Sequence, residues 1–287
     1  MKRALSRLLP KSMRPQRVTI PVIRLHGAIM PGANQFRPTL SLATTAGVIE
    51  KAFSVKDAPA VAISINSPGG SPVQSRLIYK RIRDLAAEKE KTVLVFVEDV
   101  AASGGYLIAL AGDEIIVDPS SVVGSIGVVS AGFGFQELIA KIGVERRVHT
   151  AGRNKAVLDP FQPEKKEDVE RLKALQLDVH KTFIDLVRER RGARLANDED
   201  LFTGLFWAGE RGVELGLADM VGDMRSVLRD RYGDKMRMQL ISQPRGLFGR
   251  LGRFSSRLTS PQSIASGFVH GLADAAEERA LWARFGL

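Results

Sequence analysis

Three short runs of apolar, mostly β-branched residues constrain the fold of this 287-residue chain more than any other feature. They are residues 17–25 (RVTIPVIRL), 60–66 (AVAISIN) and 92–97 (TVLVFV). Strands that are apolar on both faces are typical of a parallel sheet that helices cover on both sides. Because helical patterns alternate with these strands, the sequence predicts an α/β fold with right-handed βαβ crossovers and a mostly parallel sheet.

Further elements are predicted from periodicity, capping residues and glycine-rich breaks. The composition is that of an ordinary globular protein, with 44% hydrophobic and 26% charged residues, so disorder is not expected. Helices are predicted over residues 41–53, 72–89, 103–111, 136–142 and 164–191, with two shorter ones across 198–232, and strands over 114–117, 125–129 and 145–148.

The net charge of +10 is concentrated at the two ends of the chain. Residues 1–17 carry six basic residues and no acidic one, and residues 235–287 carry eight basic and three acidic ones. The part between them therefore has a net charge of −1. A nucleic-acid partner is therefore not expected, because the central part offers no basic groove. We expect one domain over 17–233, a basic extension over 1–16, and a basic, partly mobile tail over 234–287. The tail includes an amphipathic helix near 264–285, and the basic ends aid solubility or contact anionic membrane.

Several classes of protein are excluded or disfavoured by what the sequence lacks. The chain has no cysteine, which excludes disulfides, thiol nucleophiles and thiolate metal sites. Neither a P-loop nor a histidine–carboxylate cluster is present, so no cofactor and no metal are expected. No run approaches the roughly 18 apolar residues of a membrane-spanning helix, and no secretory signal is recognised. We therefore expect a cytoplasmic protein, either free or peripheral at the inner face of the membrane.

Three glycine-rich motifs follow predicted strands, where parallel sheets place their ligands. They are residues 66–70 (NSPGG), 101–106 (AASGGY) and 124–128 (GSIGV). In the second, Ser103 lies at a strand-to-helix turn among small residues, as a nucleophile does at an elbow, and Gly104 would offer an oxyanion-hole amide. Each motif alone is also compatible with a simple structural role, as a turn at residues 66–70, as a helix N-cap at Ser103 or as a loop serine at Ser125.

In this order and spacing, the three motifs resemble the S49 peptidases, the family of protease IV (signal peptide peptidase A) in the Clp/crotonase superfamily. The resemblance extends to residues 150–155 (TAGRNK) with 159–161 (DPF), and to 207–210 (WAGE) with 215–219 (LGLAD), so that it covers about residues 18–232. It implies a Clp/crotonase-like, mostly parallel sheet built from ββα and βαβ units, with C-terminal helices.

The resemblance also implies a role for five residues. Ser103 takes the place of the nucleophile and Lys155 that of the general base, and Ser125 matches the serine that hydrogen-bonds the lysine. Gly69 and Gly104 match the oxyanion-hole amides. In addition, the resemblance implies a homo-oligomeric ring, in which the lysine of a short chain meets the serine of the same protomer.

The function expected on this basis is that of a serine endopeptidase with a Ser–Lys dyad, acting on small peptides or on unfolded, signal-peptide-like segments. Lysine takes up the serine proton only as a neutral amine, a form that burial favours. One alternative is a crotonase-like acyl-CoA enzyme that uses the paired amides on a thioester. Another is a non-catalytic, ring-forming scaffold associated with membranes. The Ser-Gly-Gly sequence and the lysine segment favour the peptidase.

A histidine base would require one of only four histidines. His26 ends the first predicted strand, His180 lies within a long predicted helix and His270 lies in the tail, so these three are interpreted as structural or surface residues. His149 precedes Lys155 by six positions and is the only rival base.

Overall fold

The computed structural model describes residues 17–31, 39–242 and 279–287. The basic extension and most of the tail, with their expected membrane contact, lie outside the described residues. The elements, in chain order, are β1 (Thr19–His26), α2 (Leu42–Phe53), β2 (Ala60–Ser67), α3 (Pro72–Lys89), β3 (Thr92–Ala102), α4 (Gly104–Ala109), β4 (Glu114–Val117), β5 (Val122–Gly124), α5 (Gln136–Lys141), α6 (Lys166–Arg191), the 3₁₀ helices Gly192–Arg194 and Glu199–Phe202, β6 (Phe206–Ala208), α7 (Gly209–Glu214), β7 (Met220–Val221), α8 (Met224–Tyr232) and β8 (Arg237–Leu240).

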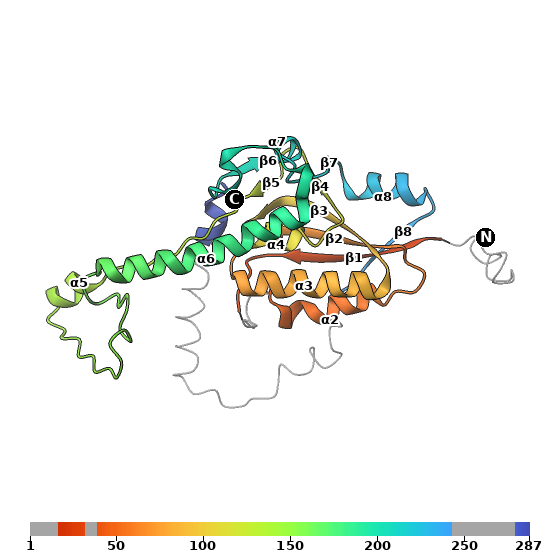
Figure 1. Cartoon of the computed structure of the whole chain (residues 1–287). Helices are drawn as coiled ribbons and strands as arrows, with labels where there is room; N and C mark the ends of the chain where they lie inside the picture. Colours follow the sequence, from red (N-terminus) through yellow and green to blue (C-terminus); the bar gives the residue numbers. More distant parts are fainter. Residues whose placement is uncertain (1–16, 32–38, 243–278) are drawn as a thin grey trace, which may run out of the picture.

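One sheet of eight strands forms the centre of the molecule (Figure 1). Six strands follow the order β6-β5-β3-β2-β1-β8. The other two lie outside this order: β4 pairs with β3, and β7 pairs with β4. All pairs are parallel except β5 with β6. The predicted α/β class with a mostly parallel sheet is therefore confirmed.

Both faces of the sheet are buried, as the apolar strands predict. In β1, Ile23 and Leu25 belong to the larger core, which also includes residues of α2, α3, α4 and α6. Ile20 and Val22 point to the opposite face, where they pack in a smaller core with residues of α8. Side chains alternate between the two faces of a strand, so a strand buried on both faces has to be apolar at successive positions.

The predicted beginnings of the first two helices are confirmed. Ser41 caps α2 through a capping box, in which its hydroxyl accepts from the Thr44 amide and the Thr44 hydroxyl accepts from the Ser41 amide. Pro72 occupies the first turn of α3, where its missing N–H costs no hydrogen bond. The predicted strands over 60–66 and 114–117 and the helices over 136–142 and 164–191 are also confirmed, to within two residues at each end.

Two predicted strands are wrong. Residues 125–129 and 145–148 form no strand; the strand nearest the first is β5, which ends at Gly124. Gly124 and Ser125 both have positive φ angles, of 109° and 54°, and this backbone conformation ends the strand. In addition, β8 lies in the range assigned to the tail, where it pairs with the edge of β1.

Residues 129–165, which we call the arm, extend away from the sheet. In Figure 1 this segment runs from the body alongside α6 and then extends beyond the N-terminal end of α6, which itself projects past the body of the molecule. The short helix α5 lies within the arm and buries none of its residues. Within the described part of the chain, no helix combines the length and apolar character needed to cross a membrane.

The C-terminal end of α6 is fixed to the body by a buried ion pair. Arg191 donates to both oxygens of Asp219, at 2.8 and 3.0 Å, and its side chain is only 2% exposed. Arg194 contacts the same carboxylate at 3.1 Å, and the Ile115 amide donates to it at 2.7 Å. Burial alone would raise the pKa of Asp219, but these hydrogen bonds and positive charges outweigh it and lower the pKa below 3.8.

Asp219→Ala should lower the free energy of unfolding by about 3 kcal/mol at neutral pH, because it leaves a buried guanidinium without its partner. The depressed pKa means that the carboxylate stabilises the fold above its unfolded value of 3.8 and that this contribution is lost as the pH falls below it. Denaturant titration at pH 7 measures the effect. Asp185→Ala, which breaks only the exposed pair with Lys181, is the control, with an expected loss of about 0.5 kcal/mol or less. Equal losses in the two variants would contradict this account.

Candidate active site

Ser103 lies between β3 and α4 in a backbone conformation that serine rarely adopts. Its φ and ψ angles are 52° and −121°. Such strain costs on the order of 1–3 kcal/mol and persists where the surroundings fix it, often at functional sites. The Ser103 amide donates to the Gly124 carbonyl at 2.9 Å, whereas its hydroxyl makes no capping hydrogen bond to α4. The N-cap interpretation of Ser103 is therefore not supported, and the hydroxyl is free to react.

A β-bulge directs the end of β3 toward this turn. After Ile65 the register between β2 and β3 shifts, and β3 gains two extra residues, Glu98 and Asp99. Asn66 holds the bulge, since its side-chain amide donates to Asp99 at 2.5 Å and its carbonyl accepts from the Val100 amide at 3.2 Å. Bulges often redirect a strand next to an active site. Here the bulge allows the last part of β3 to pair with β5.

Two of the glycine motifs meet at Ser103. A Cβ atom on Gly69 would lie 2.8 Å from the Ser103 Cβ and 2.9 Å from the Gly104 nitrogen, so only glycine permits this approach. The amide of Gly104, the first residue of α4, has no hydrogen-bond partner among the described residues. The Gly69 amide lies 3.3 Å from the Ser67 hydroxyl. In the described part of the chain the Gly70 amide has no partner either, and the sequence did not single it out as an oxyanion donor.

The third motif brings Ser125 to the same place. The Gly124 carbonyl accepts a hydrogen bond from the Ser103 amide, and Ser125 directly follows Gly124 in the chain. Ser125 is 3% exposed, and its amide donates to the Leu205 carbonyl at 2.7 Å. Its hydroxyl has no hydrogen-bond partner within the described ranges. The site therefore contains two serines, 103 and 125, whose hydroxyls are both available to a further group.

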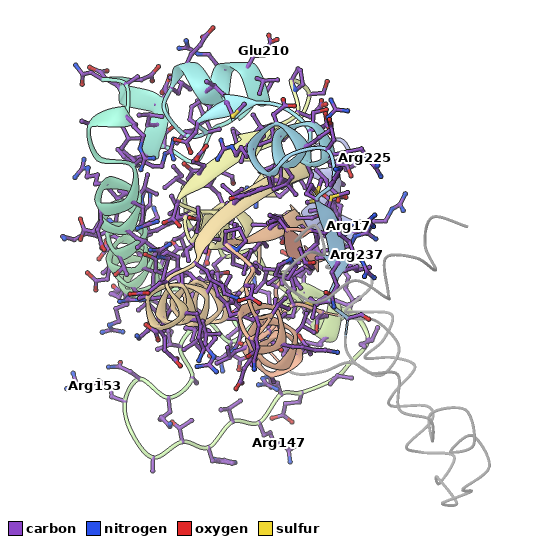
Figure 2. The ribbon with its side chains drawn as sticks, turned by 90° about the vertical axis from the view of Figure 1, so that its right-hand side faces the viewer. Arg17, Arg147, Arg153, Glu210, Arg225 and Arg237 are labelled. Atoms are coloured by element: carbon purple, nitrogen blue, oxygen red, sulfur yellow. The ribbon has the colours of Figure 1, made fainter. Side chains whose placement is uncertain are left out.

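Lys155 is not brought to this site within the chain. It is exposed and lies in a series of turns in the arm, where its amide donates to the Gly152 carbonyl at 3.2 Å. Figure 2 shows Arg153, two residues before it, on a loop that projects below the body of the molecule. The fold thus brings Ser103, Ser125 and the glycine amides close together, whereas the predicted base, Lys155, lies elsewhere, on the arm. The expected meeting of lysine and serine in one protomer is not observed in this arrangement.

A few side chains within the arm pack against one another. The rings of Phe135 and Phe161 lie 5.6 Å apart, and the Arg146 guanidinium lies 4.8 Å above the Phe161 ring. Arg146 also pairs with Asp159 at 2.8 Å, and this hydrogen bond lowers the pKa of the Asp159 carboxyl. Much of the arm's apolar surface nevertheless remains exposed, on Val129, Phe133, Leu138, Ile142, Val144 and Val148.

Tyr106 of the AASGGY motif anchors the helix that follows Ser103. Its ring is fully buried, and its hydroxyl donates to the Leu217 carbonyl at 2.8 Å. Burial raises the pKa of Tyr106 well above its usual range, so the phenol stays protonated at neutral pH. Tyr106 therefore fixes α4 against the segment that contains Leu217.

His26 belongs to a polar group beside the β3 bulge, because it lies in register with Asn66 and contacts the bulge residue Glu98. Its Nε2 lies 2.7 Å from the hydroxyl of Ser64, which donates to Glu98 at 2.5 Å. Burial lowers the pKa of His26 and outweighs the opposing effect of Glu98. The structure therefore agrees with the structural role expected for His26. His149 is exposed on the arm, as Lys155 is.

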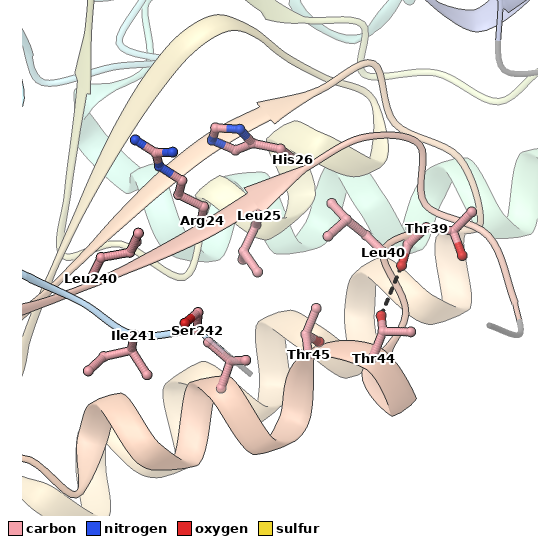
Figure 3. Close-up of a pocket in the computed structure, with 11 residues that line it drawn as sticks. Arg24, Leu25, His26, Thr39, Leu40, Thr44, Thr45, Leu240, Ile241 and Ser242 are labelled. Atoms are coloured by element: carbon pink, nitrogen blue, oxygen red, sulfur yellow. Dashed lines mark hydrogen bonds between the residues drawn. The ribbon is translucent and has the colours of Figure 1, made fainter. Parts of the chain in front are cut away.

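A cavity of about 550 Å³ lies apart from Ser103, between β1, the beginning of α2 and the end of β8. Figure 3 shows Leu25 and Thr45 facing this space, whereas Arg24 and His26 lie on the other side of β1. No predicted site residue lines it. In the part of the chain that the structure describes, no group of three or more histidine and carboxylate side chains is placed to hold a metal.

A family model described as peptidase family S49 matches residues 86–234, a range that includes Ser103, Ser125 and Lys155. The chain is 65% identical over 287 residues to a protein of Brucella abortus named Na(+)/H(+) antiporter NhaA. That alignment covers 99% of this chain but only 39% of the Brucella protein, so the chain spans well under half of the protein to which the name applies.

Two other similarities concern proteases. The chain is 32% identical over 209 residues to the chloroplastic serine protease SPPA of Arabidopsis thaliana, covering 71% of this chain and 31% of that protein. A solved structure of the 1510-N membrane-bound stomatin-specific protease, in complex with a substrate peptide, matches with a TM-score of 0.50. It covers 80% of this chain and 94% of the other at 14% identity, which supports the fold alone.

Proposed function

The chain belongs to peptidase family S49, and on that basis we propose that it hydrolyses peptide bonds as a serine endopeptidase with Ser103 as nucleophile. One observation carries the proposal: within the described residues the Ser103 hydroxyl makes no hydrogen bond, and it lies at a strained strand-to-helix turn next to Gly69 and to the unpaired Gly104 amide. A nucleophile needs this exposure, and an oxyanion needs such backbone donors.

In the proposed mechanism, Ser103 Oγ attacks the scissile carbonyl while the neutral Lys155 amine takes up its proton. The Gly104 amide and the amide of Gly69 or Gly70 stabilise the oxyanion of the tetrahedral intermediate. Lys155 then gives its proton to the leaving amine, and a water molecule hydrolyses the acyl-enzyme. Ser125, whose hydroxyl has no other partner among the described residues, would accept a hydrogen bond from the lysine.

We propose that Lys155 reaches Ser103 from a second copy of the chain in a homo-oligomer. Two observations support a second copy: the arm carries Lys155 away from its own body, and the same arm exposes apolar side chains such as Phe133, which is 82% exposed. Apolar side chains gathered on a projecting segment are typical of an interface. The docked partner would also exclude water from the lysine and so favour the neutral amine.

Co-expression of Ser103→Ala and Lys155→Ala chains with different tags tests this arrangement. Each variant alone should be inactive. In mixed oligomers, a site between an intact serine and an intact lysine should form at about a quarter of the interfaces, with activity to match. Mixed oligomers that are isolated through both tags but remain inactive would contradict an intermolecular dyad.

The proposed substrates are small peptides or unfolded segments with small or apolar side chains near the cleaved bond. The residues next to Ser103 in the chain support this choice, because Ala101, Ala102, Gly104 and Gly105 are all small and uncharged.

A further inference from the structure

The turn that carries Ser125 is held in an unusual conformation. Gly124 and Ser125 have φ angles of 109° and 54°, and the following residue, Ile126, is completely buried. A positive φ at a serine is unfavourable, so contacts around the turn have to fix it. These contacts decide where the Ser125 hydroxyl lies relative to Ser103.

Hydrogen bonds hold this turn on three sides. The Ser125 amide donates to the Leu205 carbonyl at 2.7 Å, and the Ser125 carbonyl accepts from the Gly127 amide at 2.9 Å. The third bond comes from a side chain: His180 Nε2 lies 2.9 Å from the Ile126 carbonyl. Because a carbonyl only accepts, Nε2 carries the hydrogen. His180 is thus the one side chain in the described part of the molecule that donates to the backbone of this turn.

His180 lies where α6 leaves the body of the molecule. On its C-terminal side, Phe183 and Val187 are buried in the main core. On its N-terminal side, Leu175 and Leu177 are 61% and 66% exposed, and the helix continues toward the arm. The contact therefore ties the Ser125 turn to the helix that carries the arm, at the base of its projecting part.

We infer that His180 is a positioning residue of the active site, which holds the Ile126 carbonyl and thereby places the Ser125 hydroxyl for the catalytic lysine. The inference rests on the proposed function, in which Ser125 orients Lys155. His180 thereby has a functional role, whereas the sequence alone indicated only a structural or surface residue.

Three variants in the full-length oligomer test this assignment on a fluorogenic peptide. His180→Ala should lower kcat roughly 10- to 100-fold, with little change in KM, because misplacement of a group near the reacting atoms slows chemistry more than it weakens binding. His180→Gln, whose side-chain amide donates from a similar position, should restore kcat to within about threefold of wild type. Thr182→Ala, an exposed neighbour on α6, is the control and should match wild type.

The outcomes separate this assignment from the proposed function. Wild-type kcat in His180→Ala, or equal losses in the alanine and glutamine variants at matched thermal stability, would overturn the assignment alone. A wild-type protein that neither cleaves peptides nor reacts with a fluorophosphonate would overturn the proposed function, and the assignment with it.

Discussion

Ser103→Ala should reduce peptide hydrolysis at least about a thousandfold, since it removes the nucleophile and leaves only weak catalysis by the oxyanion amides. The fold and the oligomer should be unchanged. Alanine keeps the Cβ atom that lies against Gly69, and the removed hydroxyl makes no capping hydrogen bond to α4. Incubation with a denatured proteome, followed by sequencing of the new termini, measures the activity without assuming a substrate.

The matched control is Ser120→Ala, which removes the hydroxyl of an exposed serine and should leave activity within about twofold of wild type. Substantial turnover by a purified Ser103→Ala protein, with the same cleavage pattern as wild type, would remove Ser103 from the mechanism.

Lys155→Ala should cause a loss of similar size, on the order of a thousandfold, because serine is a weak nucleophile without a base beside it. His149→Ala is the matched variant: it lies on the same arm and is exposed in the same way, but it should keep activity within about twofold of wild type. Both variants should retain the oligomer, which size-exclusion chromatography with light scattering can verify. An inactive His149→Ala protein together with an active Lys155→Ala protein would replace the Ser–Lys dyad with a Ser–His pair.

Much of the fold could be predicted because local patterns and tertiary packing agree in this chain. The strand over 60–66 is apolar on both faces and becomes a central strand of the sheet, and Ser41 and Pro72 mark helix beginnings through local hydrogen bonding and backbone geometry. Ser103 could be singled out for the same reason: a serine followed by two glycines after an apolar strand predicts a tight turn into a helix.

The parts that the sequence did not reveal depend on tertiary contacts or on their absence. Residues 145–148 (ERRV) carry three charged side chains, and they lie in the arm, where no strand is available to pair with them. Residues 237–240, in the range assigned to the tail, form the strand β8 because the edge of β1 is free to pair with them. The bond between His180 and Ile126 joins residues 54 positions apart and leaves no local signal in the sequence. The position of the arm relative to Ser103 likewise follows from packing beyond the reach of local patterns.

The most direct measurement of the central claim is to label the wild-type protein with a fluorophosphonate and to map the modified residue by mass spectrometry of its peptides. This reagent phosphonylates an activated serine hydroxyl, so it reports the nucleophile without knowledge of the substrate. We expect a single label on Ser103, absent from Ser103→Ala and strongly slowed in Lys155→Ala. A label on another serine, or none in a preparation that cleaves peptides, would contradict the assignment of Ser103 as nucleophile.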